Sequence, residues 1–579
     1  MINKRMLTDP DYIDDDIIFG MYKGEPLGLS LDNKYCGRSA NVLVIGGTGT
    51  GKTFKFVKPN ILQENASMVI TDPSGDIFAS FSPYLLSRGY NVYLFNANDF
   101  TLSNHYNPLL NVYDSNGEIV EQQVDVLVNL YMKNAKAGKE AGAGDPFWDK
   151  SEQAFMTALI YYVLENDDIP KYDKCFNKIL SLVQMAKVDD DSDEESELTK
   201  EMNAFFATHP KCKCKRYYGT FQIAPMKTAN TILITTAVDL QIFATEAVDK
   251  VTRIDERYPE MNIDIEKIAT QQSYLFLGIP QAHQAYNFLI AMLYSQLFGK
   301  LYELGDKKFK GKTYHIGYEM GRPVFDYFES KEQAVKFYET VTEENIVEKD
   351  YVNNTKMYSI VMDGRCYKSS VLKEPLIKMI NDMEKMVIWK IDDYCGDDPS
   401  LPIHVNFVLD EFKNIGEIPN FLNMLATCRK YRIGLMPIIQ SLSQIQTMYK
   451  DNEYKTLLGN VDTTIFLGSE SQDDLKFAQE LVGKTTIRQK STSDGKSGGS
   501  TSWTPTEVPV MSLDEIEDLN NSLKQRDDAI VKVRNCPAFV VRKLLVVNHR
   551  RWKYVKAVKG IDTEMYYRNN KEDDKTAYM

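Results

Sequence analysis

The 579-residue chain is poor in cysteine and histidine, with eight cysteines and six histidines. The cysteines are scattered, and no two of them form a Cys-x-x-Cys pair, which argues against a zinc site or a disulfide framework. Sparse cysteine use in a large chain is typical of a reducing compartment. Cys212 and Cys214 stand close together in a basic stretch, where we do not expect a metal.

Long apolar runs are also missing. The longest, residues 155–164 and 285–298, are shorter than the ~20 residues that a membrane helix needs. The first residues show no apolar signal-peptide core. Hydrophobic residues make up 43% and charged residues 26%, so we expect a packed, soluble, intracellular-type protein of about three or four domains.

The chain is short of positive charge, with a formal net charge of −13. An acidic total argues against a surface coated with basic residues, but it leaves room for nucleic acid in a local groove or ring lumen. The block 189–195 is acidic and reads as a solvated loop. The C-terminal segment is basic and fits either phosphate contact or a solvated face; its residues are Lys524, Arg526, Lys532, Arg534, Arg542, Lys543, Arg550, Arg551, Lys553, Lys556 and Lys559.

Several short, nearly continuous apolar runs alternate with helical spacers. This pattern is typical of strands buried on both faces of a parallel α/β sheet. The runs are residues 41–45, 67–71, 91–95, 273–280, 402–409, 433–440 and 463–467. The sequence therefore predicts an α/β fold with a parallel central sheet.

Two stretches interrupt the alternation. Apolar residues recur at helical spacing from 118 to 264, which predicts an inserted all-α domain. The stretch 305–400 is mixed, with strand candidates at 312–316 and 357–362 and a helix candidate at 330–340. We expect the central domain to comprise residues 1–117, 265–304 and 401–579, with a mobile Gly/Ser-rich loop at 491–502.

The first apolar run leads directly into a phosphate-binding loop. Glycines let backbone N–H groups curl around phosphate oxygens, and the helix that follows presents its N-terminus to the charge. The loop predicts that Lys52 neutralises the β- and γ-phosphates of ATP and that the Thr53 hydroxyl binds Mg²⁺. Its residues are Gly46, Gly47, Thr48, Gly49, Thr50, Gly51, Lys52 and Thr53. A similar stretch at 483–486 lacks the upstream glycine and strand, and we do not expect it to bind phosphate.

Asp410 and Glu411 follow another apolar run and fit a Walker B site. A carboxylate at the end of a buried strand holds the Mg²⁺ shell, and the next acid polarises the attacking water. We assign these tasks to Asp410 and Glu411, respectively.

Three further residues lie downstream. Gln440 closes the run after Walker B, where it is placed to sense the γ-phosphate or simply to solvate a strand end. Arg429 and Arg432 lie just before that run, and either is a candidate arginine finger for a neighbouring subunit or a plain surface charge.

These motifs together resemble the coupling proteins of type IV secretion and conjugation systems, the TraG/TraD-like family. Besides the loop at 46–53, the resemblance rests on segments 71–76, 106–109, 145–148, 408–412 with Ile415, Ile418 and Pro419, and 429–444. It implies a RecA-like motor domain interrupted by an all-α domain and assembled as a homo-hexamer. It also implies that Lys52, Thr53, Asp410 and Glu411 bind and hydrolyse Mg·ATP, that Gln440 senses phosphate and that Arg429 is the finger.

The resemblance further implies partners and a location. Family members bring a relaxase bound to single-stranded DNA to the secretion channel at the inner face of the cell membrane, and the all-α domain is associated with substrate recognition. The family's N-terminal membrane anchor is not seen here, so we expect either a start after the anchor or recruitment by a partner, and a monomer in isolation. Ser74, Gly75 and Asp76 also replace the family's usual Lys-Gly-Glu.

Two other functions stay open. One is a double-stranded DNA pump, although such a motor needs a duplex-reading module that the short basic segment after Lys524 does not resemble. The other is a docking receptor for protein substrates in which ATP acts as an assembly switch, which the acidic total favours.

Overall fold

The computed structural model describes residues 16–31, 36–114, 117–135, 146–186, 195–280, 284–306, 313–318, 322–390, 400–449, 452–495, 498–558 and 560–568. Asp145, most of the acidic block 189–195 and Lys559 lie outside these residues.

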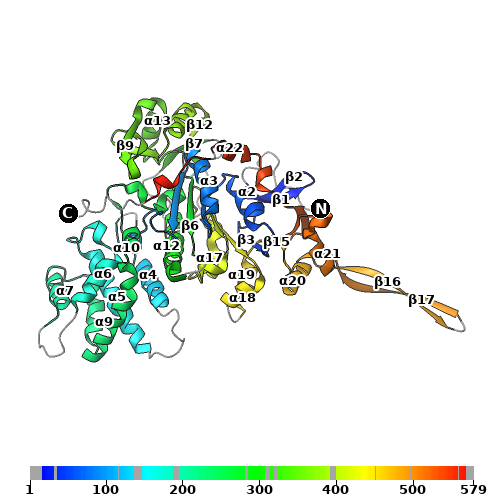
Figure 1. The fold of residues 1–579 in the computed structure, drawn as a ribbon, viewed down its shortest axis with the longest axis horizontal. Helices are drawn as coiled ribbons and strands as arrows, with labels where there is room; N and C mark the ends of the chain where they lie inside the picture. Colours follow the sequence, from blue (N-terminus) through cyan, green and yellow to red (C-terminus); the bar gives the residue numbers. More distant parts are fainter. Residues whose placement is uncertain are drawn as a thin grey trace.

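Within the described residues, an 11-stranded sheet forms the centre of the molecule (Figure 1). Its order is β2 (Glu25–Ser30), β1 (Asp16–Tyr22), β19 (Phe539–Arg542), β18 (Asp528–Val533), β15 (Thr463–Gly468), β3 (Val42–Gly46), β14 (Ile433–Ile439), β13 (Val405–Leu409), β4 (Ser67–Thr71), β6 (Ser273–Gly278) and β5 (Asn91–Asn96). Neighbours from β15 to β5 are parallel. Those from β2 to β15 are antiparallel. The predicted α/β class with a parallel central sheet is confirmed.

The strand order is that of a RecA-like core. β3, which leads into the phosphate-binding loop, pairs with β14, and β14 pairs with β13, which Asp410 follows directly. One parallel strand therefore separates the loop strand from the acidic strand. Since the strands are parallel, their carboxyl ends meet at one edge of the sheet, where ligands bind in such folds.

Both faces of the sheet are covered by helices. On β3, Leu43 and Ile45 belong to a core that includes α12 (Asn287–Asp306) and α17 (Phe421–Thr427). Val42 and Val44 point to the opposite core, which includes α2 (Lys58–Ile61) and α3 (Asp76–Ser87). Burial on two faces explains why these strands read as continuous apolar runs.

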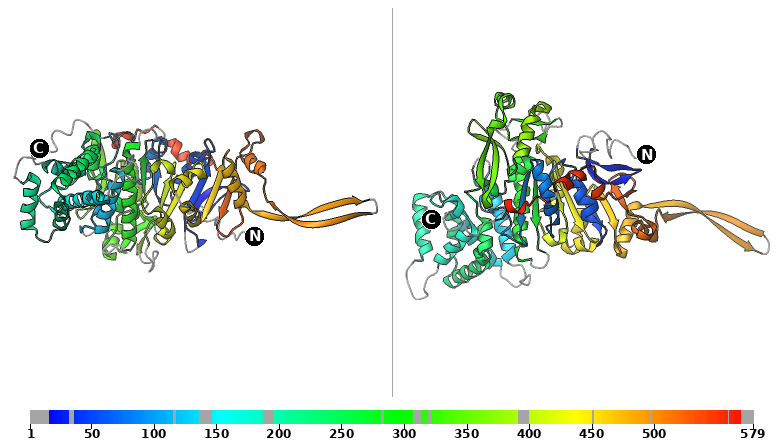
Figure 2. Two further views of the ribbon diagram at one scale, coloured as in Figure 1. Left: turned by 90° about the horizontal axis from the view of Figure 1, so that it is seen from below. Right: turned by 45° about the horizontal axis from the view of Figure 1, so that its top comes forward.

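The stretch after the first three parallel strands is helical and lies at one end of the molecule (Figures 1 and 2). It contains α4 (Glu121–Ala135), α5 (Pro146–Glu165), α6 (Phe176–Met185), α7 (Glu197–Thr208), α8 (Lys213–Gln222), α9 (Met226–Leu240), α10 (Glu246–Thr252) and α11 (Ile265–Thr270). Among the described helices, none is by itself both long and apolar enough to cross a bilayer. One pair bent by 83°, Thr228–Ala244 with Glu246–Thr252, meets the length and composition requirements together. The boundary 118–264 stays a prediction.

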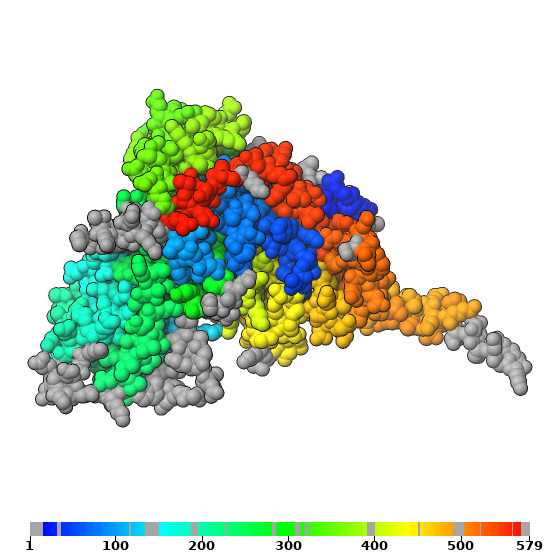
Figure 3. Space-filling model, in the orientation of Figure 1, coloured from blue at the N-terminus to red at the C-terminus, as the bar shows by residue number. Residues whose placement is uncertain are grey.

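A mixed region stands on the core beside the C-terminal segment (Figure 3). One of its small sheets contains β12 (Met386–Lys390), β7 (Tyr314–Tyr318) and β8 (Arg322–Pro323). The other contains β11 (Arg365–Ser370), β10 (Thr355–Met362) and β9 (Ile346–Tyr351), and the helices are α13 (Lys331–Thr340) and α14 (Lys373–Asn381). The strands and helix expected near 314, 357 and 331 are present, and the boundary 305–400 stays a prediction.

The expectation of a loop over 491–502 is wrong, because most of this stretch is strand. Strands β16 (Lys484–Gly495) and β17 (Gly498–Pro509) form a two-stranded hairpin that projects from the opposite end of the molecule (Figures 1 and 2). Threonine-rich strands pair along it, for example Thr485 with Val508 and Ile487 with Thr506. β-branched residues favour this extended pairing, which outweighs the turn preference of the glycines and serines.

The segment after Lys524 does not form a separate module in the described residues. It adds β18 and β19 to the central sheet and continues through α22 (Trp552–Ala557), which packs on α3.

Candidate nucleotide-binding site

The phosphate-binding loop lies between β3 and the helical turn Thr53–Val57, at the carboxyl edge of the parallel strands. Gly49 and Gly51 have φ of 78° and 88°, which side-chain-bearing residues rarely adopt. A Cβ on Gly46 would lie only 2.5 Å from Thr50 Oγ1. The loop therefore requires glycine at these positions, as a phosphate cradle does.

The Lys52 ammonium lies over the loop. Its Nζ donates to the carbonyl oxygens of Gly46 at 2.7 Å and Gly47 at 3.1 Å. Burial lowers the pKa of Lys52, while the nearby carboxylates of Asp410 and Glu411 act in the opposite direction. The amine predicted to bind phosphate thus lies within the electrostatic reach of both predicted Walker B acids.

Thr53 and Asp410 meet across the sheet edge. The Thr53 hydroxyl donates to Asp410 Oδ2 at 3.0 Å, and the Glu411 backbone N–H donates to Asp410 Oδ1 at 3.0 Å. Burial raises the pKa of Asp410, and these two hydrogen bonds and Lys52 oppose that rise. A hydroxyl beside a buried carboxylate is the hard oxygen donor set that Mg²⁺ prefers.

Glu411 starts the short helix α16 (Phe412–Ile415) in a left-handed conformation, with φ of 50°. Such a conformation is unusual for a residue with a side chain and clusters at functional sites. Its Oε2 accepts a hydrogen bond from Asn414 Nδ2 at 2.7 Å. The second acid is therefore held in a fixed orientation by its own helix.

Gln440 follows β14, the strand between the loop strand and the acidic strand. Its backbone N–H donates to Gln444 Oε1 at 3.0 Å, on α18 (Leu442–Met448). Gln440 and the loop residues Gly47, Thr48 and Thr50 line one open polar cavity of about 940 Å³. The structure thus brings Gln440 to the mouth of the phosphate-binding loop.

The two arginine candidates differ. Arg429 is exposed and precedes β14, so it lies at the edge of the sheet opposite to the loop of its own chain. Arg432 is tied to its own chain, because its Nη1 donates to the carbonyl oxygens of Leu401 at 3.2 Å and Pro402 at 2.8 Å. Of the two, only Arg429 is exposed.

Sequence reasoning did not place Lys543 at the loop. The side chain of Lys543 is 1% exposed, forms an ion pair with Asp527 at 3.2 Å and donates to the Thr50 carbonyl at 3.3 Å. Asp527 also pairs with Lys55 at 2.8 Å. Burial lowers the pKa of Lys543 to about 8. The C-terminal segment therefore contacts and stabilises the loop through Lys543. For this lysine, the interpretation as part of a solvated basic face is wrong.

Two other singled-out motifs support the fold. Asp72 Oδ2 accepts the Phe78 N–H at 2.7 Å and so stabilises the start of α3. The Tyr106 hydroxyl donates to Gln296 Oε1 at 2.5 Å, which joins the chain after β5 to α12. No residue of either motif lines the cavity at the loop.

Among the described residues, one group has ligand atoms close enough to hold a metal ion: Glu165, Cys212 and Cys214. The Glu165 carboxylate already accepts the backbone N–H groups of Lys213 at 2.9 Å and Cys214 at 3.3 Å. It therefore caps the N-terminus of α8, which accounts for its position.

Residues 1–320 match the family model described as type IV secretory system conjugative DNA transfer. Residues 404–521 match the model described as the TraM recognition site of TraD and TraG. An 89-residue segment is 30% identical to the protein VirD4 of Agrobacterium fabrum (strain C58 / ATCC 33970) and 29% identical to VirD4 of Rhizobium rhizogenes. That segment covers 15% of this chain and 13% of each relative.

Solved structures of low sequence identity are also similar. The bacterial conjugative coupling protein TrwBdeltaN70, in its unbound monoclinic form, is 13% identical with a TM-score of 0.48, over 87% of this chain and 85% of that one. The plasmid coupling protein TrwB in complex with ADP and Mg²⁺ is 14% identical with a TM-score of 0.47, over the same shares. VirB4 of Thermoanaerobacter pseudethanolicus is 11% identical with a TM-score of 0.43, over 93% and 98%.

Proposed function

Because this chain belongs to the family of type IV secretory system conjugative DNA transfer proteins, we propose that it is an ATPase that drives single-stranded DNA into a secretion channel. The observation that carries the proposal is the contact between Thr53 and Asp410, which joins the phosphate-binding loop to the acidic strand. These are the two parts that a P-loop ATPase needs.

The residues at the loop fit ATP and Mg²⁺. The Lys52 ammonium now rests on backbone carbonyls and is positioned to exchange them for phosphate oxygens. Thr53 and Asp410 supply the oxygen atoms for the metal shell. When bound, Mg·ATP supplies the phosphoryl group and the charge neutralisation that its transfer requires. The carboxylate of Glu411 orients the attacking water.

The opposite placement of two residues supports action in a ring. Gln440 lines the cavity at the loop, where it reports the presence of a γ-phosphate to β14 and α18. Arg429 lies at the other edge of its own sheet, so it reaches a phosphate only in a neighbouring subunit. We therefore assign Arg429 the role of a finger in trans within a homo-hexamer. A monomeric form is expected for the isolated chain.

Cargo recognition is assigned to regions outside the loop. We propose that the helical region within 118–264 binds the relaxase attached to single-stranded DNA. Residues 404–521, which match the TraM recognition model, are proposed to contact an accessory protein of the same system. The protein would act at the cytoplasmic face of the cell membrane, beside the channel, held there by an anchor or a partner.

A DNA-stimulated ATPase assay tests the proposal. We expect ATP turnover by the full chain to rise with single-stranded DNA more than with duplex DNA. Size measurement with a non-hydrolysable ATP analogue and single-stranded DNA should show a hexamer. Absence of turnover under all these conditions contradicts the motor function, and stronger stimulation by duplex DNA favours a double-stranded DNA pump.

A further inference from the structure

A second cavity lies at the edge of the central sheet opposite to the phosphate-binding loop. It has a volume of about 300 Å³, and its walls come from the core, the mixed region and the C-terminal segment. Core residues Tyr90 and Gln272 directly precede β5 and β6, so the cavity lies at the amino edge of the parallel strands. It shares no lining residue with the cavity at the loop.

A buried lysine forms part of the cavity wall. Lys368, on β11, is 4% exposed, and its ammonium donates to Gln271 Oε1 at 3.1 Å. Among the described residues, no carboxylate lies within ion-pair distance of Lys368. An ammonium group has three N–H donors, and a neutral amide does not compensate its charge.

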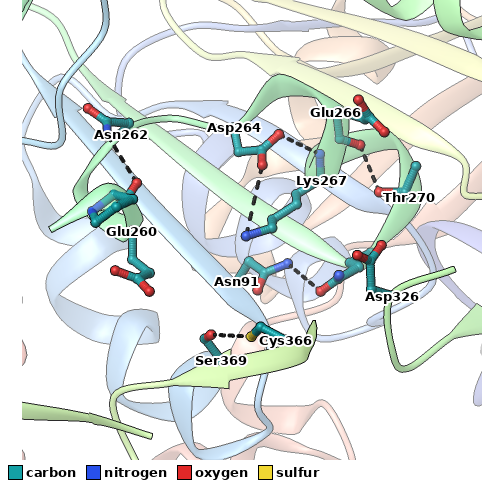
Figure 4. Close-up of polar contacts among 12 residues, drawn as sticks. Asn91, Glu260, Asn262, Asp264, Glu266, Lys267, Thr270, Asp326, Cys366 and Ser369 are labelled. Atoms are coloured by element: carbon teal, nitrogen blue, oxygen red, sulfur yellow. Dashed lines mark hydrogen bonds and ion pairs between the residues drawn. The ribbon is translucent and has the colours of Figure 1, made fainter. Parts of the chain in front are cut away.

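The surroundings of Lys368 provide that compensation only in part, because Asp326 attracts the ammonium but pairs with Arg365 at 3.4 Å. Figure 4 shows Lys267 directed at Asp264, with which it pairs at 3.9 Å. Asn91 Nδ2 donates to Gln271 Oε1 at 3.3 Å. Burial lowers the pKa of Lys368 to about 7, Lys267 adds to this effect, and Asp326 opposes it. A buried cation without an acidic partner is costly for the fold, and an anionic ligand would remove that cost.

The acid in the cavity wall is already neutralised. Glu64 accepts hydrogen bonds from Tyr90 at 2.6 Å and Arg88 at 3.1 Å, and it forms an ion pair with Arg551 at 3.7 Å. Burial raises the pKa of Glu64, but the two arginines and the tyrosine hydroxyls outweigh it, so the net shift is downward. The wall holds this one acid against four basic residues, Arg88, Arg551, Lys368 and Lys378, so the cavity carries a net positive charge.

The apolar part of the lining comes from the mixed region. Tyr318, Pro323, Val324, Pro375 and Met379 form this part of the wall. Gly89 lets the two regions approach closely, because a Cβ there would lie 2.4 Å from Met379 Cε. Pockets of this size, with apolar walls and a few placed polar groups, occur preferentially between domains and take small molecules.

We propose that this cavity binds a small organic anion, which places a carboxylate or phosphate group against Lys368 and a flat apolar body against Tyr318 and Met379. The ligand joins the mixed region to the motor core at the edge opposite to the ATP site. It is therefore an effector site rather than a second nucleotide-hydrolysis site.

Ligand-observed NMR titration of the full chain with three probes tests the proposal. Sodium benzoate and phenyl phosphate carry both the charge and the ring, and benzyl alcohol carries the ring alone. We expect saturable binding of at least one charged probe and much weaker binding of benzyl alcohol. The two charged probes distinguish a carboxylate ligand from a phosphate ligand.

Three variants locate the site. Lys368→Met should weaken the charged probe about tenfold or more, because it removes a charged hydrogen bond. Val324→Phe should do the same by filling the cavity while the lysine stays. Lys336→Met, on the exposed face of α13, is the matched control and should bind like the wild type.

Thermal unfolding of each variant confirms that it is folded. The proposal is overturned if benzyl alcohol binds as well as benzoate, or if Lys368→Met binds both charged probes unchanged. It is also overturned if phenyl phosphate alone binds and Lys52→Ala, rather than Lys368→Met, removes that binding.

Discussion

The Thr53 hydroxyl donates to the Asp410 carboxylate at 3.0 Å, although 357 positions separate the two residues in the chain. This hydrogen bond fixes the geometry of the proposed metal site, because one partner starts the helical turn after the loop and the other directly follows the acidic strand.

Lys52→Ala should lower ATP turnover about 10²-fold or more, since the variant removes the charge aimed at the transferred phosphoryl group. The fold should be retained, because among the described residues the Lys52 ammonium bonds to loop carbonyls and not to another element. Steady-state phosphate release measures the effect. Lys484→Ala, in the look-alike stretch at the base of the hairpin, is the matched control and should keep full turnover. Equal turnover of wild type and Lys52→Ala would contradict the proposed role.

The two Walker B acids should separate binding from hydrolysis. Glu411→Gln should bind ATP with near-normal affinity but lower turnover about 10²–10⁴-fold, because it loses the group that orients water. Asp410→Asn should in addition make nucleotide binding and turnover less dependent on Mg²⁺, because the wild-type carboxylate lies against Thr53. Equilibrium nucleotide binding with and without Mg²⁺, beside turnover, checks both. Glu417→Gln changes an exposed acid paired with Lys133 and should behave like the wild type.

Arg429→Ala should lower turnover about 10³-fold in the assembled state only, if the finger acts in trans. Mixing Arg429→Ala with Lys52→Ala subunits should restore part of the activity, because some interfaces then combine an intact arginine with an intact lysine. Absence of rescue at any mixing ratio argues against action in trans. Arg432→Ala should instead lower the melting temperature, since its guanidinium holds the carbonyls of Leu401 and Pro402.

Lys543→Met should raise KM for ATP, because the lysine braces the Thr50 carbonyl and pairs with Asp527. The free energy of unfolding should fall by about 1–3 kcal/mol, since a buried donor network loses its centre. Lys553→Met alters an exposed lysine of the same C-terminal segment and serves as the control. Unchanged KM and stability would show that the brace has no effect on the loop.

Lys368→Met should stabilise the ligand-free protein, with an effect that depends on pH. The pKa of Lys368 is about 7 in the folded chain and about 10.4 in an unfolded one, so the unfolded chain binds more protons between these values. Wild-type stability should therefore rise with pH from 7 to about 10.4 by a contribution that the variant lacks. The difference between variant and wild type should be largest at or below pH 7. Thermal unfolding at pH 6.5, 8 and 9.5 measures this difference. Lys336→Met is the control, and its stability relative to the wild type should not change over this pH range.

The strands of the fold can be predicted from the sequence where both faces of a strand are buried. Strands β3, β4, β13 and β14 were recognisable because each is covered on both faces and so reads as an uninterrupted apolar run. β1, β2, β18 and β19 were missed, because they form the antiparallel edge, whose pairing depends on tertiary contacts. The 484–509 hairpin was missed because its glycines and serines are typical of a loop.

In the candidate site, too, some residues could be predicted from the sequence and others could not. The loop and the two acids have local patterns with a clear chemical reason, so their positions could be predicted. Lys543 has no such pattern: its partners Asn520 and Asp527 and the Thr50 carbonyl converge only in the fold. Lys368 likewise looks like an ordinary strand residue in sequence, and its burial follows from the way the mixed region stands on the core.

The central sheet is assembled from stretches that lie far apart along the chain, which has a consequence for biogenesis. β3 lies between β14 and β15, and the phosphate-binding loop is braced by Lys543. A ribosome must therefore synthesise nearly the whole polypeptide before this loop acquires its neighbours, and the late pairing of early and late strands makes folding slow. The nascent chain therefore cannot complete its candidate nucleotide-binding site until translation is almost finished.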